Sequence, residues 1–128
     1  MSNRNWIRVF IGVVFLGLLS TASAAAMWNA NRTTYFTFNR SVQIPGATLP
    51  AGTYVFELAD PNHSLDVVRV LSKDRKRVFL TAFTRPAERP RDKKLEAAIV
   101  FGETSPGIAP PIKVWYPQDE RTGRQFIY

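Results

Sequence analysis

Apolar and polar residues alternate along much of the chain, as they do in strands that bury one face. In residues 33–44 the even-numbered positions from Phe36 onward are apolar except for Arg40, and the odd-numbered positions are mostly polar. In residues 49–59 the side chains at positions 54, 56 and 58 are apolar and share one face. A period of two residues is that of a half-buried strand. Both segments are therefore predicted to be strands, the first bent near Arg40.

Turn-forming residues bound the second of these strands. Pro50 presets φ for a turn and Gly52 tolerates a positive φ, so the strand is predicted to start from a tight corner. At its end, Asp-Pro-Asn-His-Ser at residues 60–64 favours another turn, because Pro61 cannot donate to a strand ladder.

Further strand patterns follow along the chain, at residues 65–71, 77–84, 95–103, 112–116 and 125–128. Polar or Pro- and Gly-containing segments separate them, and the mature chain carries no convincing helix. About seven short strands of this kind predict an all-β fold, either an antiparallel β-sandwich or a small barrel. The spacing of the strands does not choose between the two.

The first residues read as an export signal. Arg4 and Arg8 precede an apolar run at residues 9–19, and Ser-Thr-Ala-Ser-Ala at residues 20–24 offers a cleavage site. The run is short for a membrane span, which needs roughly 20 residues, so an uncleaved anchor is the weaker alternative. We expect a signal peptide at residues 1–24, with cleavage after Ala24 or, as second choice, after Ala26. The expected product is a single secreted or periplasmic β-domain, residues 25–128, that does not span the membrane.

Cysteine content and net charge restrict the possible cross-links, anchors and binding partners. The chain has no cysteine, which excludes disulfides and a lipid anchor on cysteine. Its formal net charge of +7 falls to +5 once Arg4 and Arg8 are removed. A basic exported protein meets anionic surfaces of the envelope more readily than nucleic acid, for which we expect no role.

The sequence contains few residues in patterns that are typical of catalytic sites. The chain has a single histidine, His63, which lies in a predicted turn, so no Cys-His or Ser-His pair is indicated. His63 with Asp60 and Asp66 makes too small a ligand set for a tight metal site. The acidic residues fall mainly in turns or beside basic groups, and no glycine-rich phosphate loop is present. We therefore expect a non-enzymatic protein without metal or cofactor.

The best binding candidate is residues 85–94, called here the basic segment. Five cations against two acidic residues give it a net charge of +3. Pro86 and Pro90 are expected to stiffen it and keep it out of the strand ladder. The cations of the basic segment could bind carboxylates or phosphates of an envelope protein or of an anionic glycan or lipid. The alternative is that the segment is a solvated crossover loop. The predicted partner-binding residues are Arg85, Arg89, Arg91, Lys93 and Lys94.

Aromatic residues near the end of the chain are a second candidate. Trp115 and Tyr116 point to opposite faces of one predicted strand, so one of them is expected to reach the surface. There it could stack on a sugar or cover a small apolar ligand. The alternative is that both close the end of the β-core.

Three short motifs carry a resemblance that covers nearly the whole mature chain. They are Leu-Pro-Ala-Gly-Thr-Tyr-Val-Phe-Glu-Leu at residues 49–58, Val-Trp-Tyr-Pro at residues 114–117 and Gly-Arg-Gln-Phe-Ile-Tyr at residues 123–128. Together they resemble a group of small exported bacterial β-rich hypothetical proteins of unknown function. The resemblance implies a bacterial envelope setting and a β-rich fold, and it brings no catalytic residues.

These observations favour a non-enzymatic exported β-domain that binds a partner or an anionic surface in the bacterial envelope, through the basic segment or an exposed strand edge. The alternative is a carrier of a small apolar ligand or glycan that uses the aromatic site.

Overall fold

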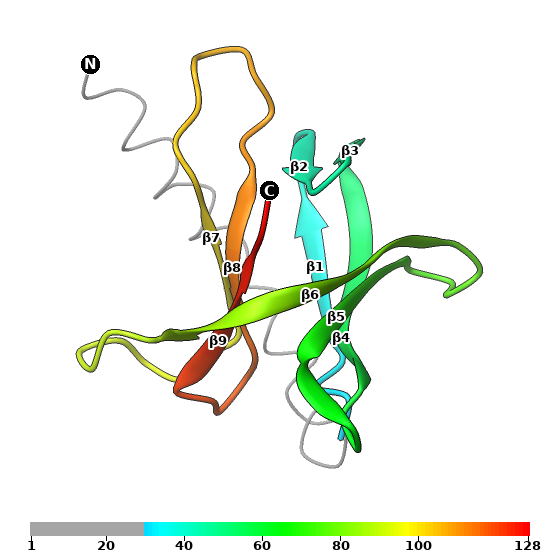
Figure 1. The fold of residues 1–128 in the computed structure, drawn as a ribbon. Helices are drawn as coiled ribbons and strands as arrows, with labels where there is room; N and C mark the ends of the chain where they lie inside the picture. Colours follow the sequence, from blue (N-terminus) through cyan, green and yellow to red (C-terminus); the bar gives the residue numbers. More distant parts are fainter. Residues whose placement is uncertain (1–29) are drawn as a thin grey trace.

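The computed structural model describes residues 30–128, and all regular structure in this range is β-strand (Figure 1). The predicted signal peptide, residues 1–24, lies outside the described residues. The absence of helix from residues 30–128 agrees with the predicted all-β class. The strands are β1 (Thr34–Phe38), β2 (Val42–Ile44), β3 (Ala47–Leu49), β4 (Gly52–Asp60), β5 (Ser64–Ser72), β6 (Val78–Glu88), β7 (Ala98–Phe101), β8 (Ile112–Tyr116) and β9 (Thr122–Phe126).

Seven of the strands form one antiparallel sheet in the order β1-β4-β5-β6-β9-β8-β7, and β2 pairs with β3 in a small second sheet. The long strand β6 joins the two halves of the large sheet. Its first part pairs with β5 up to Phe83, and its second part, from Thr84, pairs with β9. In Figure 1, β6 runs across the view between the group β1, β4, β5 and the group β7, β8, β9. The sheet is curled into a half-barrel, which fits the predicted sandwich or small barrel.

Polar contacts draw the two ends of the curled sheet together. The Gln43 backbone N–H of β2 donates to the Pro110 carbonyl at 2.8 Å, and its side-chain amide donates to the Ala109 carbonyl at 2.8 Å. The Tyr128 hydroxyl, after β9, donates to the Gln43 carbonyl of β2 at 3.0 Å. Before β1, the Arg32 guanidinium donates to Glu120 at 2.6 Å. The β2–β3 hairpin and the start of β1 therefore bind to the half that carries β8 and β9.

An aromatic cluster fills the core between the two halves. The Phe56 ring of β4 lies 5.4 Å from the Phe36 ring in an edge-on arrangement, 6.2 Å from Trp115 and 6.3 Å from Phe126, as ring centroids. Such pairs contribute about 0.5–1.5 kcal/mol each beyond the area they bury. Phe56 thus connects β1 and β4 to β8 and β9.

The first predicted strand is interrupted where a bend was expected. Residues 33–44 form β1 and β2, which belong to different sheets, and the chain bends at residues 39–40 between them. Strand β3 was not predicted. It pairs with β2 across a tight turn in which Gly46 has φ +80°, a conformation that favours glycine.

The prediction that Pro86 keeps the basic segment out of the ladder was wrong. Strand β6 continues through Arg85 and Pro86 to Glu88, and Pro86 lies opposite Arg124 of β9. β5 pairs with β6 only as far as Phe83, so beyond this point no described strand lies along the other edge of β6. A proline is tolerated on such an edge because its missing N–H breaks no ladder bond there.

Candidate functional site

Arg89 anchors the basic segment from the inside. Its side chain is 5% exposed, and its guanidinium donates to backbone carbonyls of the returning loop and of the β8–β9 turn. These bonds run to Lys94 at 2.8 Å and Glu96 at 2.5 Å in the loop, and to Pro117 at 2.9 Å and Glu120 at 3.1 Å in the turn. One arginine therefore fixes the path of the chain after β6.

The Arg89 guanidinium also lies over an aromatic ring. Its central carbon is 4.8 Å from the centroid of the Tyr116 ring, a cation–π geometry. Burial lowers the pKa of Arg89 from its ordinary value, and burial likewise raises the pKa of Tyr116. The Tyr116 hydroxyl donates to the Glu88 carbonyl at 3.3 Å, so the ring is held at both ends.

Gly123 of β9 makes room for this ring. A Cβ at Gly123 would lie 2.4 Å from Tyr116 Cδ1 and 2.9 Å from the Trp115 carbonyl oxygen, distances at which atoms overlap. The Tyr116 ring therefore packs directly on the backbone of the neighbouring strand, under Arg89. Tyr116 is only 8% exposed as a result.

Three of the predicted site residues are thus not available in the way the sequence suggested. Arg89 was expected to bind a partner, but its donors are occupied by carbonyls of its own chain. Trp115 and Tyr116 point to opposite faces as predicted, but neither is exposed: Trp115 is fully buried in the core. The expectation that one of the pair reaches the surface was wrong because Arg89 and the loop it holds cover Tyr116.

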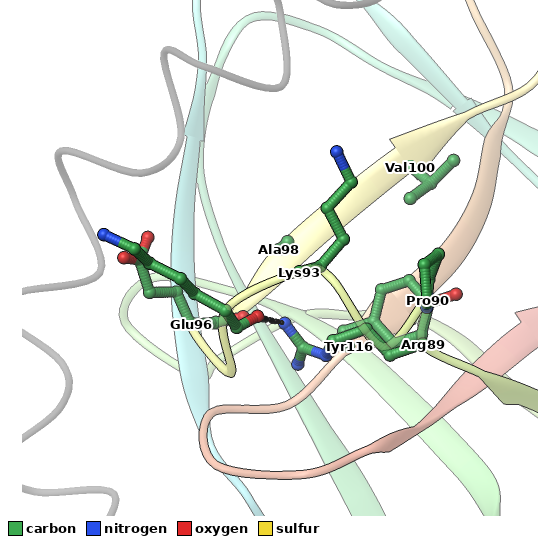
Figure 2. Close-up of a pocket in the computed structure, with 8 residues that line it drawn as sticks. Arg89, Pro90, Lys93, Glu96, Ala98, Val100 and Tyr116 are labelled. Atoms are coloured by element: carbon green, nitrogen blue, oxygen red, sulfur yellow. Dashed lines mark hydrogen bonds between the residues drawn. The ribbon is translucent and has the colours of Figure 1, made fainter.

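A pocket of about 590 Å³ lies beside the covered ring (Figure 2). We call it the Tyr116 pocket. Ala98 and Val100 of β7 share with Tyr116 the face of the sheet that looks away from the core, and Val100 is exposed. Pro90, Lys93, Lys94 and Glu96 supply the loop side. The residues that line it are Arg89, Pro90, Lys93, Lys94, Glu96, Ala98, Val100 and Tyr116.

The cations predicted to bind partners fall into separate groups. Lys93 and Lys94 are exposed at the pocket and form no ion pair within the described residues. Arg85, on β6, and Arg91, in the loop, are exposed but do not line it. The structure therefore brings Lys93 and Lys94 together with Tyr116, which the sequence had assigned to a different candidate site.

His63 and the acidic residues were also considered as possible metal ligands from the sequence. His63 is exposed, and a hydrogen bond with Asp60 at 2.8 Å raises its pKa. Within residues 30–128 there is no group of three or more side chains suited to hold a metal. His63 therefore lies in an exposed turn with Asp60 as its hydrogen-bond partner.

Glu57 is a buried carboxylate that the sequence did not single out. It accepts hydrogen bonds from Arg69 at 2.5 Å, Arg75 at 3.0 Å and Thr33 at 3.0 Å. Burial by itself raises the pKa of Glu57, but the bonds from Arg75, Arg69 and Thr33 outweigh it and hold the pKa below its ordinary value. The opposition of Glu57 to Arg69 in the β4–β5 register was the signal that could have found this cluster.

Comparisons of the chain with protein-family models, with curated proteins and with solved structures find no match. The resemblance to small exported bacterial proteins stays a prediction. Nothing in residues 30–128 forms a helix of the length and apolarity that a membrane crossing requires.

Proposed function

We propose that this chain is a non-enzymatic, exported binding module of the bacterial envelope whose binding site is the Tyr116 pocket. The ligand is a group that combines a negative charge with an adjoining apolar part. The observation that carries the proposal is that the pocket places an apolar floor next to two lysines that form no ion pair within residues 30–128.

The apolar floor of the pocket supports the apolar part of this ligand. Ala98, Val100 and the Tyr116 ring present carbon atoms to the pocket, and Val100 is 40% exposed where nothing in the described chain covers it. Binding an apolar group there removes this surface from water, which contributes a favourable free energy of about 25 cal/mol per Å² of buried apolar area. Pockets that bind ligands are commonly apolar with a few polar groups that fix orientation.

The lysines at the mouth of the pocket support the negatively charged part of the ligand. Lys93 and Lys94 carry two positive charges at the mouth, and Arg89 adds a third that is already engaged with carbonyls. A carboxylate or phosphate would find the lysines accessible, because no carboxylate of residues 30–128 lies within ion-pair distance of them, although Glu96 also lines the pocket. Since Arg89 fixes the loop, the lysines are presented on a held backbone, which lowers the entropy lost on binding.

Envelope extract passed over the immobilised protein, made from the full-length sequence, tests the proposal. The variant Lys93→Gln/Lys94→Gln is compared with Lys73→Gln/Lys76→Gln, which removes the same charge from the β5–β6 turn. We expect a retained component to elute at moderate salt, because salt screens exposed charges. Its binding should weaken by roughly 2- to 30-fold in the first variant, since exposed ion pairs contribute about 0.2–1 kcal/mol each. Equal retention by both variants would contradict the proposal.

A carrier of a small apolar ligand or glycan is the second candidate, favoured by the same apolar floor. Such a ligand should stay bound as salt rises, and its binding should depend on Val100 and not on Lys93 and Lys94. Val100→Asp would then abolish binding while Lys93→Gln/Lys94→Gln leaves it unchanged. Mass spectrometry of the salt-resistant fraction decides between a carried molecule and an anionic partner.

A further inference from the structure

Arg124 lies in the interior of the protein, on the core side of β9. Its strand position faces Trp115 of β8 on one side and Pro86 of β6 on the other. Residues opposite each other in a ladder share a face, so Arg124 and Trp115 point to the same side of the sheet, the side that carries the core residue Phe126. The Arg124 side chain is 4% exposed.

No carboxylate forms an ion pair with the buried Arg124 guanidinium. All ten acidic residues of the chain lie in the described part, and none of them is within ion-pair distance of Arg124. Its one hydrogen bond is a long contact of 3.4 Å from an Nη to the Gly123 carbonyl, and its Nε–H has no partner. Buried cations are ordinarily paired, because removing a charge from water is costly.

The neighbouring indole of Trp115 also has an unpaired N–H group. Trp115 is fully buried and its Nε1–H also lacks a partner. These are the buried side-chain nitrogen or oxygen atoms within residues 30–128 that form no hydrogen bond. They come from directly opposed residues on the adjacent strands β8 and β9, so the two unmet donors mark one place in the fold.

We propose that Arg124 and Trp115 form an internal binding site for a small monovalent anion, such as a halide or a simple carboxylate. The guanidinium supplies the charge, and the indole N–H supplies a second donor. A water molecule fits less well, because it must also donate its own hydrogens and the two side chains offer it no acceptor. The surrounding Phe126, Ile99 and Phe56 side chains keep the ligand small.

This site is independent of the Tyr116 pocket. Trp115 and Tyr116 are consecutive residues of β8 and point to opposite faces of the sheet. The anion would lie on the core side and contribute to folding stability, whereas the pocket opens on the other face.

Nuclear magnetic resonance of ¹⁵N-labelled protein, made from the full-length sequence, tests the site directly. The probes are sodium chloride and sodium formate, with sodium gluconate at matched ionic strength as the anion too large to enter. We expect the Trp115 indole and Arg124 Nε–H signals to shift together, along one saturation curve, in chloride and in formate but not in gluconate. Signals that stay fixed in all three salts, or that respond equally to gluconate, would overturn the proposal.

Thermal unfolding with matched variants gives a second readout. Replacing gluconate by chloride should raise the wild-type Tm by roughly 4–8 °C, because an anion that binds only the folded state stabilises it. Arg124→Met should lose this response, and Trp115→Phe should weaken it. Lys113→Met, an exposed cation on the same strand as Trp115, should keep it. A response that survives in Arg124→Met would count against the site; if that variant fails to fold, the wild-type titration decides alone.

Discussion

Five cations close together in the sequence have different roles because their surroundings differ. Arg89 is buried under the loop that it organises, whereas Lys93 and Lys94 face solvent at the mouth of the pocket. Composition and local pattern cannot separate these cases, since the carbonyls that Arg89 binds at Pro117 and Glu120 come from a distant turn. The sequence could therefore predict a cationic surface but not its anchor.

Arg89→Lys tests the anchoring role. Lysine keeps the charge, but a single ammonium cannot reach carbonyls in two segments as the planar guanidinium does. We expect the free energy of unfolding, measured by urea denaturation at pH 7, to fall by about 2–4 kcal/mol. Arg91→Lys, at an exposed position, should change it by less than about 0.5 kcal/mol. Similar small effects for both variants would show that Arg89 does not hold the loop.

Glu57 makes stability depend on pH in the acid range. Its pKa is lower in the folded protein than its ordinary value of 4.5, so its stabilising contribution is present above that value and is lost as the pH falls through the folded pKa. Glu57→Gln should lower the free energy of unfolding at pH 7 by about 1–3 kcal/mol and flatten its decline below pH 4.5. Urea midpoints between pH 7 and pH 3 measure this, and parallel pH profiles of the two proteins would refute it.

At the scale of elements, strands with regular alternation were predicted well, because burial of one face repeats every two residues. β4, β5 and β8 lie close to the predicted ranges. β3 is three residues long and too short to show a period. β9 begins at Thr122, within a segment that reads as a turn, because Gly123 is a strand residue that makes room for a ring from β8.

Gly123→Ala tests this packing between β8 and β9. The added Cβ would overlap the Tyr116 ring and displace it from beneath Arg89. We expect a loss of about 1–3 kcal/mol of unfolding free energy, typical of overpacking. In a Tyr116→Ala background the same change should cost less, because the ring it strikes is gone. An equal cost in both backgrounds would mean that Tyr116 does not lie on Gly123.

At the scale of the whole molecule, the curl of the sheet determines where the Tyr116 pocket lies. The sequence singled out Lys93, Lys94 and Tyr116 but assigned them to rival sites, whereas the structure places all three at one pocket. Their meeting depends on how the chain after β6 returns across β7 and β8, and such contacts between distant segments leave no local pattern. For the same reason, Arg124 falls between the predicted strands at residues 112–116 and 125–128 and is instead a buried residue of β9 opposite Trp115.

The most direct test of the binding site is hydrogen exchange of the protein with and without the component that elutes from it in moderate salt. Mass spectrometry of peptides locates the amides that become protected. We predict protection centred on residues 89–101, which include the loop side of the Tyr116 pocket and β7, and no change in the β5–β6 turn at residues 73–77. Protection confined to another face, or none at a concentration where the component is bound, would contradict the proposed site.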